Sequence, residues 1–159
     1  MRLKLLFICL GNICRSPAAE GVMKKLLQDD GLEGEVYCDS AGTSGFHIGA
    51  QADKRMLEAA SLRNYHLTSR SRKIAGEDFS EFDYLIAMDD SVYQSLHKFF
   101  EKNEHKEKIV KMTDFSVNRK ETEVPDPYFG GMAGFDFVLD ILEDSCGGLL
   151  KHIKLKHNF

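Results

Sequence analysis

Several residue types and patterns are scarce or absent in this chain of 159 residues. It has no tryptophan, three prolines and four cysteines. No apolar run approaches the ~18 residues that a transmembrane helix needs. No cysteine pair has the Cys-x2-Cys spacing and the six histidines are scattered, so we expect no metal site. The net charge of −4 gives no basic excess, which argues against nucleic-acid binding.

The length and composition are typical of a single globular domain spanning residues 1–159. Hydrophobic residues make up 43% and charged residues 29%. The first ten residues combine a positive start with an apolar run, but this run is too short for a signal peptide and lacks a small-residue cleavage site. We therefore interpret it as a buried strand and expect a cytoplasmic protein without membrane insertion. In that reducing compartment the cysteines are thiols at rest.

Short apolar stretches alternate with helical patterns along the chain. Strands are expected at residues 3–9, 35–40, 83–88 and 108–112. Apolar spacing predicts helices that open at Ser16-Pro17 and that cover residues 52–60, 92–100 and 135–153, with Gly147-Gly148 breaking or fraying the last one. This alternation predicts an α/β fold with a parallel sheet between two layers of helices. Ligands of such folds bind beyond the carboxyl ends of the strands.

The loop after the first strand carries the strongest chemical signal. Residues 9–16, called the Cys9 loop below, read CLGNICRS and precede Pro17. Gly11 and Asn12 tolerate a positive φ, so the backbone can curl and direct N–H groups inward at a helix N-terminus, which makes an anion site. Arg15 can bind two oxygens of the same anion. Cys9 in that field is expected to be largely thiolate, a nucleophile placed for attack on phosphorus.

These residues resemble a known family. The Cys9 loop resembles the Cys-x5-Arg-Ser signature of the low-molecular-weight protein tyrosine phosphatases, which carry it directly after the first strand. Residues 124–130, VPDPYFG, resemble that family's Asp-Pro-Tyr loop, and residues 39–43, 82–89 and 143–146 resemble further segments, so the resemblance covers essentially the whole chain. It implies a three-layer sandwich around a four-stranded parallel sheet in the order 2-1-3-4, wound as in flavodoxin.

The resemblance also implies the reaction. Phosphotyrosine and aryl phosphates would be hydrolysed through a phosphocysteine on Cys9, without a cofactor and with inorganic phosphate as product. Arg15 and the loop amides would bind the phosphate, and Asp126 would act as general acid and then base. From the residues alone, Asp126-Pro127 would be a turn. The implied partner is a phosphotyrosine-containing protein, with tyrosine kinases among the candidates, and the implied assembly is a monomer or a weak dimer.

Other site residues are assigned by their positions in the family's motifs. The substrate cleft would be walled by Leu10, Ile13, Phe46, Tyr128 and Phe129, and the phosphate would also be contacted by Gly11, Asn12, Cys14 and Ser16. Asn12 and Ser40 would hold the Cys9 loop in its curl, and the Ser16 hydroxyl would hydrogen-bond the Cys9 sulfur. Cys14 would form a protective disulfide with Cys9 on oxidation.

One departure from the family lies at Ser69, where members usually have a histidine in the Asn12 and Ser40 network. A serine reaches less far and cannot carry charge, so a water or Arg70 would have to replace it. We otherwise interpret the basic run at residues 70–73 as a solvated face.

Other functions are conceivable on this pattern. A thiol-dependent arsenate reductase would need relay cysteines downstream, yet none lies between Cys38 and Cys146. A phosphoprotein-binding module without activity would have lost Cys9, Arg15 or Asp126. A phosphoarginine substrate is a third alternative, but relatives with that activity tend to have threonine at the position of Ile13.

Overall fold

Four parallel strands form the centre of the computed structural model, which describes residues 2–99 and 105–159. The strands are β1 (Leu3–Cys9), β2 (Val36–Gly42), β3 (Tyr84–Ala87) and β4 (Ile109–Lys111). Their order in the sheet is β2-β1-β3-β4, as expected, and all pairings are parallel. Each predicted strand is present, with ends that differ by up to two residues.

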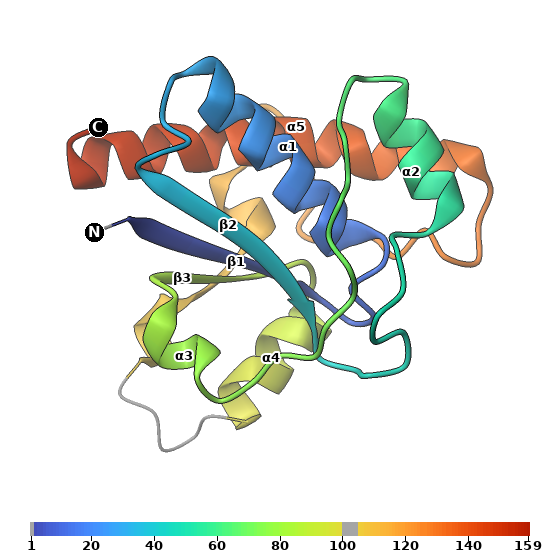
Figure 1. Ribbon diagram of the computed structural model, residues 1–159, viewed down its shortest axis with the longest axis horizontal. Helices are drawn as coiled ribbons and strands as arrows, with labels where there is room; N and C mark the ends of the chain where they lie inside the picture. The colour runs from blue at the N-terminus through green and yellow to red at the C-terminus, as the bar shows by residue number, and fades with distance from the viewer. Residues whose placement is uncertain (1, 100–104) are drawn as a thin grey trace.

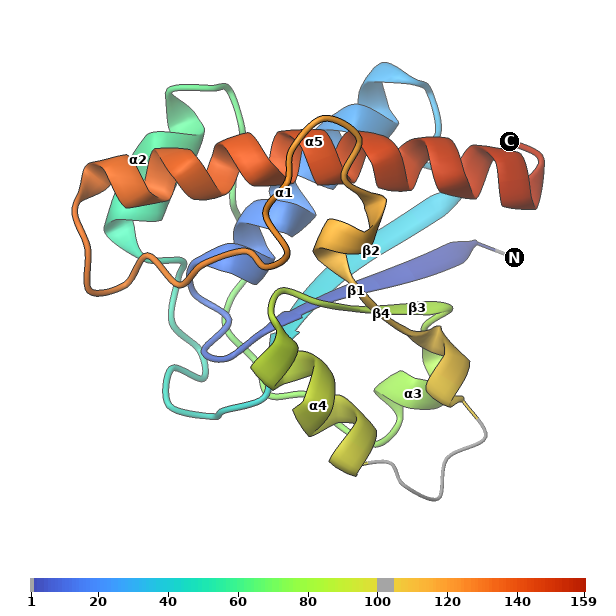
Figure 2. The same cartoon turned by 180° about the vertical axis from the view of Figure 1, so that it is seen from behind.

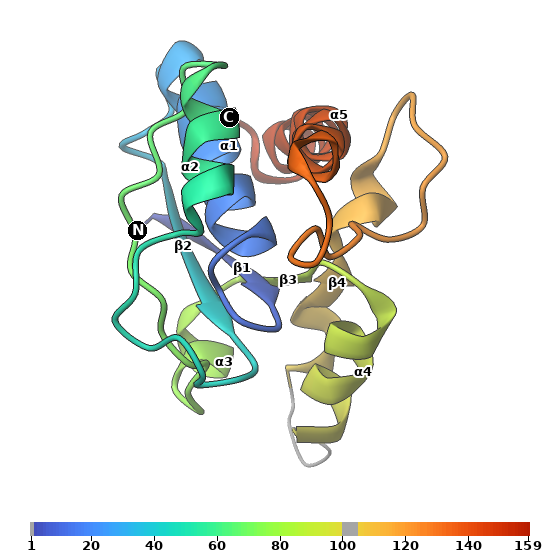
Figure 3. The same cartoon turned by 90° about the vertical axis from the view of Figure 1, so that its right-hand side faces the viewer.

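Helices cover both faces of this sheet (Figures 1 and 2). One face carries α1 (Arg15–Asp29), α2 (Lys54–Ser61) and α5 (Met132–His157), and the other carries α3 (Asp78–Glu81) and α4 (Asp90–Phe99). The three layers are seen end-on in Figure 3, with the sheet between α1 and α5 above and α3 and α4 below. Two short 3-10 turns, η1 (Lys106–Lys108) and η2 (Met112–Phe115), flank β4.

The alternation of side chains along β1 explains why both faces need cover. Leu5 and Phe7 pack in the core beneath α1 and α5, whereas Leu6 and Ile8 pack in the core on the α3 and α4 side. All four side chains are fully buried. A strand buried on both faces has the nearly continuous apolar sequence that this segment shows.

Two helix predictions are wrong in detail. Helix α1 begins at Arg15 with Cys14 as its N-cap, so Ser16 lies inside the first turn and not at the cap. Helix α5 runs unbroken through Gly147-Gly148, because Gly148 packs against the Phe115 backbone, where a Cβ would overlap the carbonyl oxygen. Phe100, included in the predicted third helix, lies outside the described residues.

The described helices do not meet the requirements of a membrane span. Within residues 2–99 and 105–159, none combines the length and the apolar character that crossing a bilayer requires.

Candidate active site

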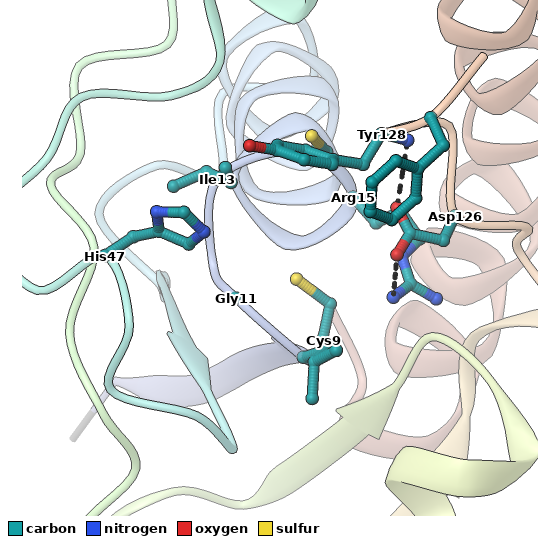
Figure 4. Close-up of a pocket in the computed structure, with 10 residues that line it drawn as sticks. Cys9, Gly11, Ile13, Arg15, His47, Asp126 and Tyr128 are labelled. Atoms are coloured by element: carbon teal, nitrogen blue, oxygen red, sulfur yellow. Dashed lines mark hydrogen bonds and ion pairs between the residues drawn. The ribbon is translucent and has the colours of Figure 1, made fainter.

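A cleft opens at the carboxyl edge of the sheet, where β1 leads into α1. It encloses about 190 Å³. Figure 4 shows the Cys9 thiol pointing into the space between His47 on one side and Arg15 and Asp126 on the other, with Tyr128 across the opening. The cleft is lined by Cys9, Leu10, Gly11, Ile13, Cys14, Arg15, His47, Asp126, Tyr128 and Phe129. Most of the predicted site residues therefore share one cavity.

The curl of the Cys9 loop depends on Asn12, which has a positive φ of 56°. Its backbone N–H donates to Cys9 Sγ over 3.3 Å. Its side-chain Nδ2 donates to Ser16 Oγ over 2.8 Å, and Ser16 Oγ lies 3.0 Å from Cys9 Sγ. Because the Ser16 oxygen accepts from Asn12, its own proton is available for the sulfur. This commitment of the hydroxyl also explains why Ser16 does not cap α1.

Arg15 is held rigidly at the side of the cleft, with only 3% of its surface exposed. Its Nη1 donates to Asp89 Oδ2 over 2.5 Å and to the Val124 carbonyl oxygen over 3.1 Å. Burial by itself would lower the pKa of Arg15, but Cys9 and Asp89 outweigh it and raise that pKa. The guanidinium is therefore a fixed positive charge beside the Cys9 sulfur, in a protein whose net charge is negative.

The segment after α2 supports the Cys9 loop from outside. The Arg72 backbone N–H donates to Asn12 Oδ1 over 2.9 Å, and Ser71 Oγ donates to the Gly11 carbonyl oxygen over 3.0 Å. The Arg72 guanidinium binds both Asp39 and Asp78. The expectation of a fully solvated basic run is therefore wrong for Arg72, and the loop is supported by residues two and three positions beyond Ser69.

Ser40 is buried in β2, as expected of a residue that supports the Cys9 loop, but its side chain does not hydrogen-bond the loop itself. Its hydroxyl donates to Glu20 Oε1 over 2.6 Å, and the Glu20 carboxylate also pairs with Lys24 at 2.5 Å. Glu20 lies on α1, on the turn after the Cys9 loop. Ser40 is therefore joined to the helix that follows the loop and not directly to Asn12.

The Asp126 carboxylate faces the same cleft from the segment between η2 and α5. Its side chain is 45% exposed, and Oδ2 lies 3.8 Å from Arg15 Nη2. Its other oxygen, Oδ1, accepts from the Tyr128 backbone N–H over 3.1 Å. The Tyr128 and Phe129 rings meet edge to face with centroids 5.0 Å apart. The carboxyl group of Asp126 thus lies on the side of the thiol opposite His47, with the Tyr128 ring across the opening (Figure 4).

The loop after β2 contributes a different residue from the one predicted. Phe46 is 90% exposed and does not line the cleft, whereas its neighbour His47 does. The His47 ring lies against Gly11, where a Cβ would be 3.1 Å from His47 Cδ2, and its centroid is 6.3 Å from that of Tyr128. Adjacent residues of a turn point in different directions, and spacing in the sequence does not reveal which one turns inward.

Cys14 lies in the same cleft as Cys9 but in a different environment. It is 4% exposed. Burial, followed by the charge of Asp53, raises the pKa of Cys14 to about 12. Cys14 is therefore a neutral thiol at physiological pH, which makes it a weaker candidate than Cys9 for attack on phosphorus.

The residues at this site that were not predicted include Asp89, His47 and Arg72. The sequence held a signal for Asp89, because it lies two residues after the buried strand β3 and so stands at the carboxyl edge of the sheet, where β1 also ends. No local pattern distinguishes His47 or Arg72, whose contacts join segments far apart in the chain. Among the described residues, no group of three histidine, cysteine or acidic side chains could hold a metal ion.

This chain is similar to known proteins over nearly its whole length. The family model described as low molecular weight phosphotyrosine protein phosphatase matches residues 4–158. Low molecular weight phosphotyrosine protein phosphatase 2 of Drosophila melanogaster is 37% identical over 153 residues, which are 96% of this chain and 93% of that protein. A crystal structure of a protein tyrosine phosphatase from Entamoeba histolytica, with Hepes in its active site, is 52% identical with a TM-score of 0.92 and covers 98% of both chains.

A third similar structure is that of DARP, a Drosophila arginine phosphatase. It is 33% identical with a TM-score of 0.89, and the match covers 96% of this chain and 98% of DARP. The same fold thus occurs in proteins named for two different phosphorylated residues, so the substrate has to be argued from the cleft itself.

Proposed function

We propose that this chain, which belongs to the low molecular weight phosphotyrosine protein phosphatase family and is thus a protein-tyrosine-phosphatase, works through a phosphocysteine on Cys9. The observation that supports this most strongly is the convergence of a thiol, a fixed guanidinium and a carboxyl group on one cleft. Cys9 and Arg15 lie in one loop, whereas Asp126 is more than a hundred residues further along the chain, and all three line the same cleft.

In the first step the Cys9 thiolate attacks phosphorus, so that an S–P bond forms as the bond to the tyrosyl oxygen breaks. Asp126 gives its proton to that leaving oxygen. The inward N–H groups of the Cys9 loop and the Arg15 guanidinium bind the other phosphate oxygens and stabilise their charge in the transition state. Asp89 and Val124 hold Arg15 ready for this role.

In the second step water attacks the phosphocysteine and releases inorganic phosphate. Asp126, now a carboxylate, takes a proton from this water. The sulfur leaves as a thiolate, which the Ser16 hydroxyl and the Asn12 N–H can stabilise, since both lie within bonding distance of Sγ. The step regenerates the resting enzyme without any cofactor.

The walls of the cleft support phosphotyrosine as the substrate. Leu10, Ile13, Tyr128 and Phe129 offer apolar and aromatic surface to a flat phenyl ring. Ile13 in particular provides no hydroxyl for a guanidinium group. A phosphoarginine substrate would gain no hydrogen bond from this side chain, and it is therefore the weaker candidate.

The nucleophile and the acid are tested by p-nitrophenyl phosphate hydrolysis as a function of pH, with EDTA present. Cys9→Ser should abolish turnover, because a serine hydroxyl is not ionised in this field. Asp126→Ala should lower kcat by ~10²–10⁴-fold, the usual contribution of general acid–base catalysis. Substantial turnover by Cys9→Ser would contradict the nucleophile assignment, and equal rates with and without Asp126 would remove it from the mechanism.

Cys14 is proposed as a redox partner of Cys9. Peroxide would oxidise the Cys9 thiolate to a sulfenic acid, which the Cys14 thiol then attacks, forming a disulfide and releasing water. The raised pKa of Cys14, about 12, leaves Cys9 as the first target at neutral pH. Peroxide-treated wild type should recover activity with dithiothreitol, whereas Cys14→Ser should lose more activity irreversibly. Equal recovery of the two proteins would contradict the disulfide.

The natural substrate is proposed to be a phosphotyrosine-containing protein in the cytoplasm, with tyrosine kinases among the candidates. A monomer or a weak dimer is proposed as its assembly, which sedimentation equilibrium over a range of concentrations would test.

A further inference from the structure

The position of Asp126 depends on how its loop is attached to the rest of the fold. Asp126 lies in the segment between η2 and α5, called the Asp126 loop below (residues 116–131). Its carboxyl group has two neighbours, the Tyr128 N–H within the same loop and the more distant Arg15. These contacts leave the side chain 45% exposed. The position of the carboxyl group is therefore set largely by the backbone of the residues just before Asp126.

That backbone is fixed two and three residues earlier, at Val124 and Glu123. The Val124 N–H donates to the Met88 carbonyl oxygen over 2.8 Å, and the Val124 carbonyl oxygen accepts from Arg15. Glu123 adds a third bond, in which its Oε1 accepts from the Asp90 backbone N–H over 3.0 Å. Among these three bonds, the Glu123 bond alone comes from a side chain with no contact to the phosphate site, so it can be removed separately.

The charges around the Asp90 N–H favour the approach of the Glu123 carboxylate. Asp90 is the first residue of α4, a helix of ten residues, so its N–H lies at the positive end of the helix dipole. The Asp90 side chain would repel Glu123, but Lys111 Nζ pairs with it at 2.6 Å. Glu123 can therefore approach the N-terminus of α4, and its hydrogen bond joins the Asp126 loop to the first residue of that helix.

We infer that Glu123 is a positioning residue for the general acid: its hydrogen bond to the Asp90 N–H holds the Asp126 loop so that Asp126 reaches the leaving oxygen. The inference rests on the proposed role of Asp126. Without the bond, residues 122–124 keep the two Val124 bonds and the bond from the Thr113 hydroxyl to the Thr122 carbonyl oxygen, but none of these joins the loop to α4, and the carboxyl group spends less time in reach of the substrate. Attack by Cys9 and phosphate binding by Arg15 are unaffected.

This role has a chemical signature, because only some leaving groups need a proton. Phenolate from phenyl phosphate is a poor leaving group and requires Asp126, whereas 2,4-dinitrophenolate departs without protonation. For Glu123→Ala we expect kcat/KM to fall about tenfold with phenyl phosphate, a part of the ~10²–10⁴-fold that a general acid supplies. With 2,4-dinitrophenyl phosphate the change should stay within about twofold, since the acid makes no contribution there.

Two further variants separate positioning from general damage. Glu123→Gln keeps an amide oxygen that can accept from the Asp90 N–H, so it should retain activity close to wild type with both substrates. Glu121→Ala removes another carboxylate of the same loop, one that pairs with Arg119 over 2.7 Å, and should leave both rates unchanged. Thermal unfolding of each variant shows whether the fold is intact.

The outcomes distinguish this inference from the proposed function. If Asp126→Ala itself loses equal activity with both substrates, the acid assignment fails. If Asp126→Ala discriminates between the leaving groups but Glu123→Ala does not, the acid is correct and the role of Glu123 is overturned. Equal losses with both substrates in Glu123→Ala, or the same loss in Glu123→Gln, would also overturn it.

Discussion

Arg15 is the residue on which the electrostatics of the cleft depend. It is nearly fully buried, yet one of its nitrogens binds both Asp89 and the Val124 carbonyl oxygen. Asp89 also accepts from the Val92 N–H through its other oxygen, over 2.8 Å. A single carboxylate thus caps α4 and orients the guanidinium, so the ends of β1 and β3 are coupled through one ion pair.

We predict that Asp89→Asn weakens phosphate binding. The amide oxygen can still accept from Val92, so α4 keeps its cap, but the charge beside Arg15 is lost. A hydrogen bond to a charged group is worth about 1.5–3 kcal/mol, so kcat/KM with p-nitrophenyl phosphate should fall about 10- to 100-fold. The inhibition constant of inorganic phosphate should rise in parallel.

Asp140→Asn is the matched control for this experiment. Asp140 pairs with Arg63 at 2.9 Å, on the surface between α2 and α5. Both substitutions remove one charge from an arginine–aspartate pair, but only Asp89 faces the cleft cation. An unchanged phosphate inhibition constant in Asp89→Asn would show that Arg15 is oriented without it.

At the residue scale, the sequence predicts contacts within one loop better than contacts between loops. Cys9, Asn12, Arg15 and Ser16 lie within eight residues, and their order at a strand-to-helix turn restricts the conformations that they can adopt. Phe46 was wrongly placed in the cleft wall, because a turn can direct either of two neighbours inward. The chemical roles of the cleft residues stay predictions until the variants are measured.

At the scale of elements, the packing of α5 on η2 explains one of the two consecutive glycines in this helix. The two have opposite surroundings: Gly148 is buried against the Phe115 backbone, while a Cβ on Gly147 would meet no atom within 4 Å. The sequence suggested a break in the helix at this point, because glycine lowers helix propensity. The close approach of η2 is a tertiary contact, and it outweighs that propensity.

A pair of alanine substitutions tests this explanation. Gly148→Ala should lower the free energy of unfolding by about 1–3 kcal/mol, the usual cost of forcing atoms into a packed core. Gly147→Ala should raise it by roughly 0.5–1 kcal/mol, because alanine favours a helix over glycine. Urea unfolding followed by circular dichroism measures both. Equal effects of the two substitutions would contradict the close packing of α5 on η2.

Other elements were predictable to different extents. The strands β1 and β3 are buried on both faces. Successive side chains must therefore be apolar, and this is visible in the sequence as a nearly continuous apolar run. The start of α1 was misassigned by two residues, because Ser16 fits the preferences of an N-cap but its hydroxyl accepts from Asn12 and lies beside Cys9 Sγ. The preference of a residue for a cap position applies when its side chain has no other partner. A hydrogen bond to another residue of the site can override that preference.

At the scale of the whole molecule, the fold creates a local positive site in a chain of net charge −4. Three segments meet at the carboxyl edge of the sheet: the Cys9 loop after β1, Asp89 after β3, and the Asp126 loop before α5. Each is anchored to another by hydrogen bonds, including those of Arg15 to Val124 and of Val124 to Met88. The proposed nucleophile, anion-binding groups and acid thus belong to one connected arrangement, although more than a hundred residues separate Cys9 from Asp126.

The central claim is the covalent phosphocysteine on Cys9, and the most direct test is to trap it. Wild type would be mixed with p-nitrophenyl phosphate, quenched in acid within milliseconds to seconds, digested and examined by mass spectrometry. We predict one added phosphoryl group on the peptide that contains Cys9, located on its sulfur, and none in Cys9→Ser. A phosphoryl group on another residue, or turnover by wild type with no phosphorylated cysteine at any quench time, would contradict the account.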